Sequence, residues 1–231
     1  MKRDSEEARQ PGPALPWGVG WTADGVIAVL EPLATPARRA RLLEVIEQRL
    51  ESVTLLMDAP HDPHNGAAVV RSCDAFRVQV IHVVERNEPF LVSTRVAQGA
   101  ERWVDVVTHP TPEAALDTLA ARGFTLVTSH PQGDMNPEQL ATIPRLALVL
   151  GNEHDGICRM LTAAAERSVR VPMRGFVESL NVSVSAALLL LAATQTRSGD
   201  LPDADRRMLY ARGLFRSLPR AADVLDALAP R

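Results

Sequence analysis

The chain has 231 residues, of which 46% are hydrophobic and 23% are charged, and its formal net charge is −3. This length allows one sizeable core, or one core with helical appendages, and the net charge excludes a polycation that binds nucleic acid through its overall charge. The isolated Cys73 and Cys158 form no CxxC motif or disulfide framework, which favours a reducing cytoplasm. Residues 1–10 are too charged for a signal peptide, and the apolar run 188–193 is too short to span a membrane.

The first part of the chain predicts a flexible N-terminal arm over residues 1–35, followed by a helix over 36–51. Several prolines and glycines interrupt the arm, whereas Pro36 is suited to the first turn of a helix. The apolar positions of residues 36–51 have helical spacing. The opposite face carries Arg38, Arg39 and Arg41, which taken alone indicate a solvated surface but which, together with the arginines near the C-terminus, are candidate contacts to RNA phosphates.

The middle of the chain, residues 52–197, alternates short apolar runs with segments of helical length. The predicted strands are 53–57, 78–84, 103–107, 124–129, 146–150 and 168–171. The predicted helices are 66–76, 111–122, 157–167 and 180–196. Continuous apolar strands that alternate with helices are typical of a mostly parallel sheet covered by helices on both faces, an α/β fold.

After residue 197 the composition changes, and residues 198–231 predict a C-terminal helical extension. A linker at 198–202 precedes two amphipathic helices at 203–217 and 219–229. The extension carries several arginines, among them Arg206, Arg207 and Arg212. Arginine pairs bidentately with phosphate, so these residues are candidate RNA contacts, although a solvated or dimer-stabilising tail explains them as well.

Three polar clusters follow predicted strands, where open α/β sheets place their ligands. The first joins Asn65, a suitable helix N-cap, to Arg71, whose guanidinium leans toward the helix start and could meet a phosphate. The second is the run 151–156, which has a glycine at each end. The third spans 171–185, where Ser179 is either an N-cap or part of a polar site.

Other chemical motifs are weak or absent. The sequence has no GxGxxG, no P-loop and no GxSxG, which argues against a dinucleotide fold, a nucleotide triphosphatase and a hydrolase of that type. Asp58, His61, Asp62 and His64 could suggest a metal site, but Pro60 and Pro63 leave the geometry undefined and no third histidine or cysteine has matching spacing. No metal is predicted.

The three clusters resemble the three motifs of the SpoU/TrmH family, RNA ribose 2′-O-methyltransferases of the SPOUT superfamily. The resemblance covers about residues 36–228. It is carried by Pro-His-Asn at 63–65 with Arg71, by Leu-Gly-Asn-Glu-His-Asp-Gly-Ile at 150–157, and by Val-Pro-Met-Arg-Gly at 171–175 leading to Ser-Leu-Asn-Val-Ser-Val at 179–184. It implies a deep trefoil knot near the C-terminus of the catalytic domain that binds S-adenosylmethionine, and a homodimer.

The same resemblance implies roles for individual residues. Arg71 matches the residue that activates the ribose 2′-hydroxyl, either as an electrostatic stabiliser or as a base whose proton a substrate phosphate shares. Asn65 and Arg71 of one subunit are implied to complete the site of the other. The remaining catalytic positions are Glu153, Ser179 and Asn181. The positions implied to hold the cofactor are Ser129, Gly151, Val171, Met173 and Leu180.

The terminal extensions are similar to those of the family's tRNA enzymes that methylate guanosine 18 in the D-loop, which makes tRNA the expected partner. A ribosomal RNA or another tRNA position is the alternative within the family. A non-catalytic RNA-binding protein on the same fold is the alternative from another class, but such a protein would be expected to lose Arg71 or Asn181, and both are present.

Overall fold

The computed structural model describes residues 15–18, 20–85, 89–90, 93–152 and 154–228. The chain folds into two units, one of Glu47–Pro202 and one of Met1–Ile46 together with Asp203–Arg231. The sequence predicted boundaries after residues 35, 51 and 197, with separate N-terminal and C-terminal extensions. The structure differs because the two ends of the chain pack together into a single helical unit.

The unit of Glu47–Pro202 contains the predicted α/β fold, with a parallel sheet in the order β3-β2-β1-β5-β4-β6. The strands are β1 (Val53–Asp58), β2 (Val80–Val84), β3 (Asp105–His109), β4 (Thr125–Ser129), β5 (Leu146–Leu150) and β6 (Arg167–Val169). The predicted second and third strands began two residues too early. Arg77 is a turn residue with φ 69°, and Val78 then makes an isolated bridge to Leu50 before β2 begins, while Trp103 caps the end of η2 (Ala100–Arg102).

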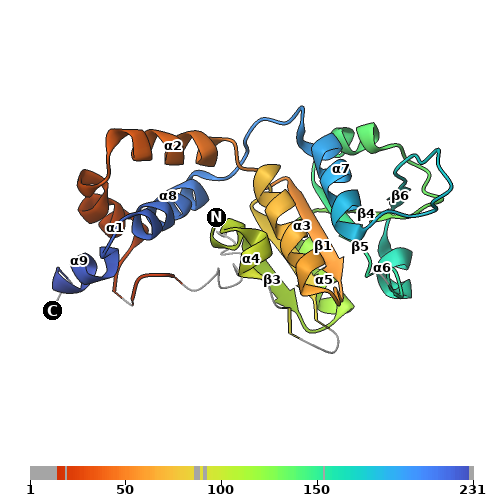
Figure 1. Cartoon of the computed structure of the whole chain (residues 1–231), viewed down its shortest axis with the longest axis horizontal. Coiled ribbons are helices and arrows are strands. Elements are labelled where there is room, and N and C mark those ends of the chain that lie inside the picture. The colour runs from red at the N-terminus through yellow and green to blue at the C-terminus, as the bar shows by residue number, and fades with distance from the viewer. Residues whose placement is uncertain (1–14, 19, 86–88, 91–92, 153, 229–231) are drawn as a thin grey trace, which may run out of the picture. The chain divides into compact units, whose positions relative to one another are not determined.

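Helices cover both faces of the sheet, as predicted, because alternate side chains of each strand point to opposite faces. The helices α3 (Pro63–Ala75) and α7 (Val182–Thr194) lie side by side on one face, together with α4 (Thr94–Ala97) and η3 (Pro137–Thr142) (Figure 1). The helices α5 (Pro112–Ala121) and α6 (Arg159–Ala164) pack on the other face.

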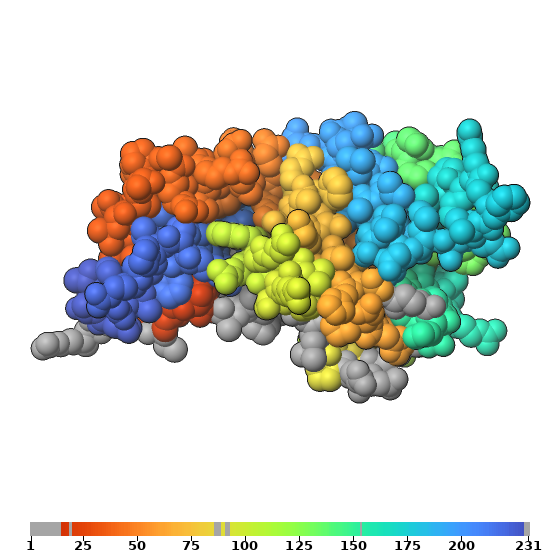
Figure 2. All heavy atoms as spheres, viewed as in Figure 1, coloured from red at the N-terminus to blue at the C-terminus, as the bar shows by residue number. Residues whose placement is uncertain are grey.

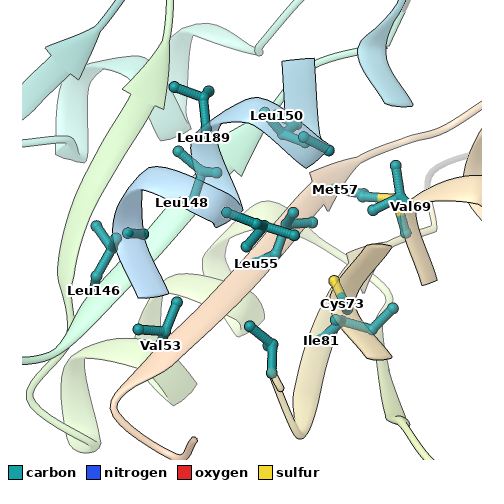
Figure 3. Close-up of a cluster of buried hydrophobic side chains, with 14 of the residues drawn as sticks. Val53, Leu55, Met57, Val69, Cys73, Ile81, Leu146, Leu148, Leu150 and Leu189 are labelled. Carbon is teal, nitrogen blue, oxygen red and sulfur yellow. The ribbon is translucent and has the colours of Figure 1, made fainter. Parts of the chain in front are cut away.

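The main core lies between the sheet and the helices α3 and α7. Figure 3 shows Val69 and Cys73 of α3 and Leu189 of α7 meeting the strand residues Leu55 and Leu148, all of them buried. The neighbouring residue Leu56 belongs instead to the core under α5 and α6. Burying both faces of the strands in this way explains why their sequences are continuous apolar runs rather than alternating ones.

The second unit consists of α1 (Ala23–Leu30), η1 (Glu31–Leu33), α2 (Pro36–Glu47), α8 (Asp203–Ser217) and α9 (Ala221–Ala227). The predicted flexible arm over 1–35 is therefore wrong for residues 23–33. Thr22 caps α1 by accepting a bond from the Gly25 amide at 3.1 Å, and α1 packs against α8. Arg207 of α8 pairs with Asp24, so polar as well as apolar contacts join the two ends of the chain.

Among the described residues, no helix is both long enough and apolar enough to cross a membrane.

Candidate active site

Three of the predicted cofactor positions lie at the carboxyl edge of adjacent strands. Ser129 is the last residue of β4, Gly151 directly follows β5, and Val171 follows β6 by two residues. The strands β5, β4 and β6 are consecutive neighbours in a parallel sheet, so their carboxyl ends meet at one edge. The loops that the sequence singled out therefore converge as expected.

The loop after β5 is a tight turn held by its own backbone and by Asn152. The backbone groups of Asn152 and Gly156 exchange two hydrogen bonds of 3.2 Å. The Asn152 Oδ1 accepts bonds from the amides of His154 at 2.9 Å and Asp155 at 2.7 Å. A Cβ at Gly151 would lie 2.3 Å from the Gly156 carbonyl carbon, so the turn closes only with glycine there.

A buried carboxylate fixes this loop to the neighbouring strand. Asp58, the last residue of β1, is completely buried, and its Oδ2 accepts a bond from the Cys158 amide at 2.7 Å. From the sequence, Asp58 is predicted only as a possible metal ligand. Its structural role was signalled by its position at the end of a continuous apolar strand, where an acidic side chain needs internal donors.

An asparagine pair joins the first polar cluster to the third. The Asn181 Nδ2 donates to the Asn65 Oδ1 at 3.0 Å. The Asn181 Oδ1 in turn accepts bonds from the Ser183 amide at 2.8 Å and the Ser183 hydroxyl at 2.6 Å. The contact is possible because α3 and α7, which carry these residues, pack against each other.

The prediction of Asn65 as a helix cap is wrong, and of the two roles open to Ser179 the structure excludes the cap. Asp62 caps α3 by accepting from the His64 amide, so Asn65 lies in the first turn rather than at the cap. Asn181, not Ser179, caps α7. Asp62 competed successfully because Pro63 is well suited to the first helical position. The Ser179 hydroxyl therefore has no capping role.

The other catalytic and cofactor positions lie around this network. Arg71 is exposed on α3, six residues after Asn65, and Ser179 is exposed in the loop before α7. Met173 is half-buried and Leu180 is exposed in the same loop. Glu153 lies outside the described residues. The structure thus joins Asn65 to Asn181 directly, and shows no direct bond from Arg71 to either of them.

The edge has a donor that suits a small polar ligand. Asn152 is only 7% exposed, and its Nδ2 has no hydrogen-bond partner among the described residues. A buried amide donor of this kind is costly unless a ligand or water accepts from it. S-adenosylmethionine carries carboxylate, ribose and adenine acceptors, so the donor set fits it. Within the described part of the chain, no three metal-ligating side chains form a cluster.

The arginines predicted to bind RNA differ in exposure. Arg38 and Arg41 are exposed on α2, whereas Arg39 is half-buried. Arg207 is exposed and pairs with Asp24, and Arg206 lies 3.7 Å from Asp203. Arg212 is 6% exposed, so its prediction as an RNA contact is corrected: it faces the interior of the helical unit.

Comparison with known proteins decides the family. The model of the SpoU rRNA Methylase family matches residues 52–191, which include all three polar clusters. The chain belongs to this family. The resemblance inferred from the motifs is thereby confirmed, as is the α/β fold class, whereas the trefoil knot is implied by the family. The chain is 30% identical over 197 residues to the tRNA (guanosine(18)-2′-O)-methyltransferase of Escherichia coli K12, covering 81% of this chain and 86% of that protein.

Solved structures extend the likeness of this SpoU family member to three dimensions. The TrmH/SpoU tRNA modifying enzyme of Aquifex aeolicus has a TM-score of 0.70 and 25% identity, covering 79% of this chain and 98% of that one. The SpoU methyltransferase AviRb of Streptomyces viridochromogenes, solved in complex with AdoMet, has a TM-score of 0.57 and 26% identity, covering 67% and 60% of the two chains.

Proposed function

We propose that the protein transfers a methyl group from S-adenosylmethionine to a ribose 2′-hydroxyl of tRNA, at guanosine 18, in the cytoplasm. The observation that carries the proposal is the bond between Asn65 and Asn181, which joins two of the three family motifs in one polar network. The named function of the E. coli relative supports the choice of substrate, and the AdoMet complex of AviRb supports the choice of cofactor.

The carboxyl edge of β5, β4 and β6 holds the cofactor in this proposal. Backbone groups at Ser129, Gly151 and Val171 face it, Met173 and Leu180 add apolar contacts, and the buried Asn152 amide donates to it. The bound cofactor supplies a methyl group on a sulfonium, which is already a strong donor. The protein therefore mainly has to position the ribose oxygen in line with that methyl group.

Arg71 prepares the ribose hydroxyl for the transfer. A guanidinium keeps its proton at neutral pH, so it is a poor base unless a phosphate of the RNA shares that proton. It can, however, stabilise the negative charge that develops on the 2′-oxygen as the proton leaves. Asn65, Asn181 and Ser179 position the nucleotide around it, together with Glu153.

A homodimer is part of the proposal because α7 leaves an apolar stripe uncovered. Val184, Leu188 and Leu191 are 46%, 43% and 47% exposed, and their spacing places them on one face of the helix. The helix itself forms part of the surface in Figure 2. A second copy of the chain covers this stripe. Since Asn65 already contacts Asn181 of its own chain, Arg71 is the residue of α3 that completes the partner's site.

The helical unit supplies the grip on the RNA. Arg38, Arg39 and Arg41 lie together near the start of α2, and Arg206 and Arg207 lie in α8. Each phosphate that they neutralise releases counterions, so removal of one contact lowers the slope of log K against log salt by about 0.7 to 0.9. We expect shallower slopes for Arg38→Ala/Arg41→Ala and for Arg207→Ala. An unchanged slope in both variants leaves these helices a structural role.

To test the reaction, tRNA and ribosomal RNA are taken from a deletion strain and treated with the purified protein. Mass spectrometry then maps the ribose methylation that the protein adds. Methyl transfer to guanosine 18 supports the proposal, whereas methylation elsewhere moves the substrate to the family's alternatives. Calorimetry with S-adenosylmethionine in the presence of a chelator tests the cofactor separately. If the folded protein does not bind S-adenosylmethionine, it is not a methyltransferase.

A further inference from the structure

Two histidines from different loops meet at the carboxyl edge of the sheet. His61 lies in the loop between β1 and α3, and His154 lies in the loop after β5. Their rings contact each other edge to face, with centroids 5.3 Å apart and an interplanar angle of 61°. The strands β1 and β5 are parallel neighbours, which brings the two loops together.

Both histidines are held on restricted backbone. His154 follows the turn that Asn152 closes through two amide bonds. His61 lies between Pro60 and the N-cap Asp62, where the next helix begins. The bonds of Asn152 fix the backbone at His154, and the flanking Pro60 restricts the backbone beside His61, so the meeting of the two rings follows from how these two loops are built.

The pair has no evident role inside the chain. Both side chains are exposed, and neither imidazole has a hydrogen-bond partner in the part of the chain that the structure describes. The contrast is with His82 and His109, which are stacked, buried and bonded to each other at 2.8 Å between His82 Nδ1 and His109 Nε2. That second pair is part of the fold, whereas the first presents its ring surface to solvent.

We propose that His61 and His154 form one binding platform for an unpaired RNA base next to the ribose that is methylated, in which the base stacks on the face of one imidazole while the other ring, edge to face with the first, closes its side; this inference rests on the proposed function. Proteins that read single-stranded RNA stack splayed bases on aromatic side chains, histidine included. A base fits the pair better than a phosphate because the exposed carboxylates of Asp62 and Asp155 neighbour the two histidines in the sequence. A phosphate there would meet negative charge.

The experiment compares alanine and phenylalanine variants of both positions. We expect His61→Ala and His154→Ala each to raise the KM for tRNA by about 5- to 150-fold, the range that base stacking on an aromatic ring contributes, with cofactor affinity unchanged. Phenylalanine at either position restores most of the loss, because it keeps a ring face. The double alanine variant loses less than the product of the two single effects, because the two rings act as one platform.

A second readout separates this inference from the proposed function. The RNA affinity of each variant is measured by fluorescence anisotropy, which needs no methyl transfer. If the wild type binds RNA without methylating it, the proposed function fails and the platform is judged from affinity alone. Unchanged KM and affinity in the alanine variants overturn the platform, as does a phenylalanine variant as impaired as alanine. A wild type that binds no RNA overturns both.

Discussion

The two edges of the sheet use similar polar side chains for different purposes. At the amino edge, arginines are bonded within the protein: Arg197 donates to the carbonyls of Pro144 and Ala193, both at 2.9 Å, and Arg77 donates to the carbonyl of Thr194 at 2.5 Å. Arg71 is exposed along α3 between the two edges, and at the carboxyl edge His61, His154 and Ser179 are exposed in loops. The amino edge holds the fold together, whereas the carboxyl edge is available to ligands.

The comparison shows that the type of residue does not by itself indicate function. Most basic side chains of this chain are arginines. Two of them, Arg77 and Arg197, donate hydrogen bonds to carbonyls near the end of α7 and the start of β5. What separates Arg71 from Arg77, six residues later, is that Arg77 finds carbonyl acceptors and Arg71 points to solvent.

The largest expected effect is on catalysis. Arg71→Ala should lower the rate of methyl transfer by about 100- to 1,000-fold, the loss typical of removing one donor that stabilises a developing oxyanion. Its free energy of unfolding should change by no more than about 0.5 kcal/mol because the side chain is exposed. Single-turnover rates and urea unfolding measure the two. A variant within a few-fold of wild-type activity would show that Arg71 is not catalytic.

At the amino edge, a substitution is expected to lower stability. Arg197→Ala should lower the free energy of unfolding by about 3 kcal/mol, because it leaves several carbonyls at the start of β5 and the end of α7 without their donor. Urea unfolding measures it, with the exposed Arg159→Ala on α6 as the matched control. Equal stabilities of the two variants would contradict the structural role of the amino edge.

A glycine next to Arg197 tests how tightly that edge is packed. A Cβ at Gly199 would lie 1.8 Å from the Glu47 carbonyl oxygen, so Gly199→Ala should cost about 2 to 3 kcal/mol of stability. The matched control is Gly175→Ala, in the loop before α7, where a Cβ meets nothing within 4 Å. Thermal unfolding of both variants measures the difference. The prediction fails if Gly175→Ala is the less stable of the two.

The buried histidine pair gives the smallest effect, and it depends on pH. Burial first, and the neighbouring His109 second, lower the pKa of His82 from 6.5 to about 3. The folded state therefore binds fewer protons than the unfolded state between these values, so stability is complete above about pH 6.5 and is lost as the pH falls toward 3. At pH 5 the loss from His82 is about 2 kcal/mol.

The control for this prediction replaces both histidines. In His82→Leu/His109→Leu the paired donors and acceptors disappear together, which leaves no orphaned group. Urea unfolding at pH 7 and pH 5 should show a smaller loss of stability in this variant than in the wild type. If both proteins lose the same stability between pH 7 and pH 5, the loss comes from titratable groups other than this histidine pair.

The parallel sheet and most of its helices could be predicted because the strands are buried on both faces and the helices have regular apolar spacing. The site motifs could be predicted because they occupy the strand-to-helix junctions. The caps could not be predicted from residue type alone, because Asp62 and Asn65, or Ser179 and Asn181, are equally good capping residues; at α3 the proline at the first helical position favours Asp62. The single helical unit could not be predicted either, because its contacts join residues about 180 positions apart, such as Asp24 and Arg207.

That union of the two ends has a consequence for how the chain is made. Residues 47–202 leave the ribosome with every strand of the sheet and both of its helical layers, so this unit can fold while synthesis continues. The apolar side of α1, with Val26 and Leu30 buried in the finished protein, has to wait for α8. The helix α1 is thus made before the sheet yet is among the last elements to reach its final environment, and the closure of so long a loop makes its docking a late step of folding.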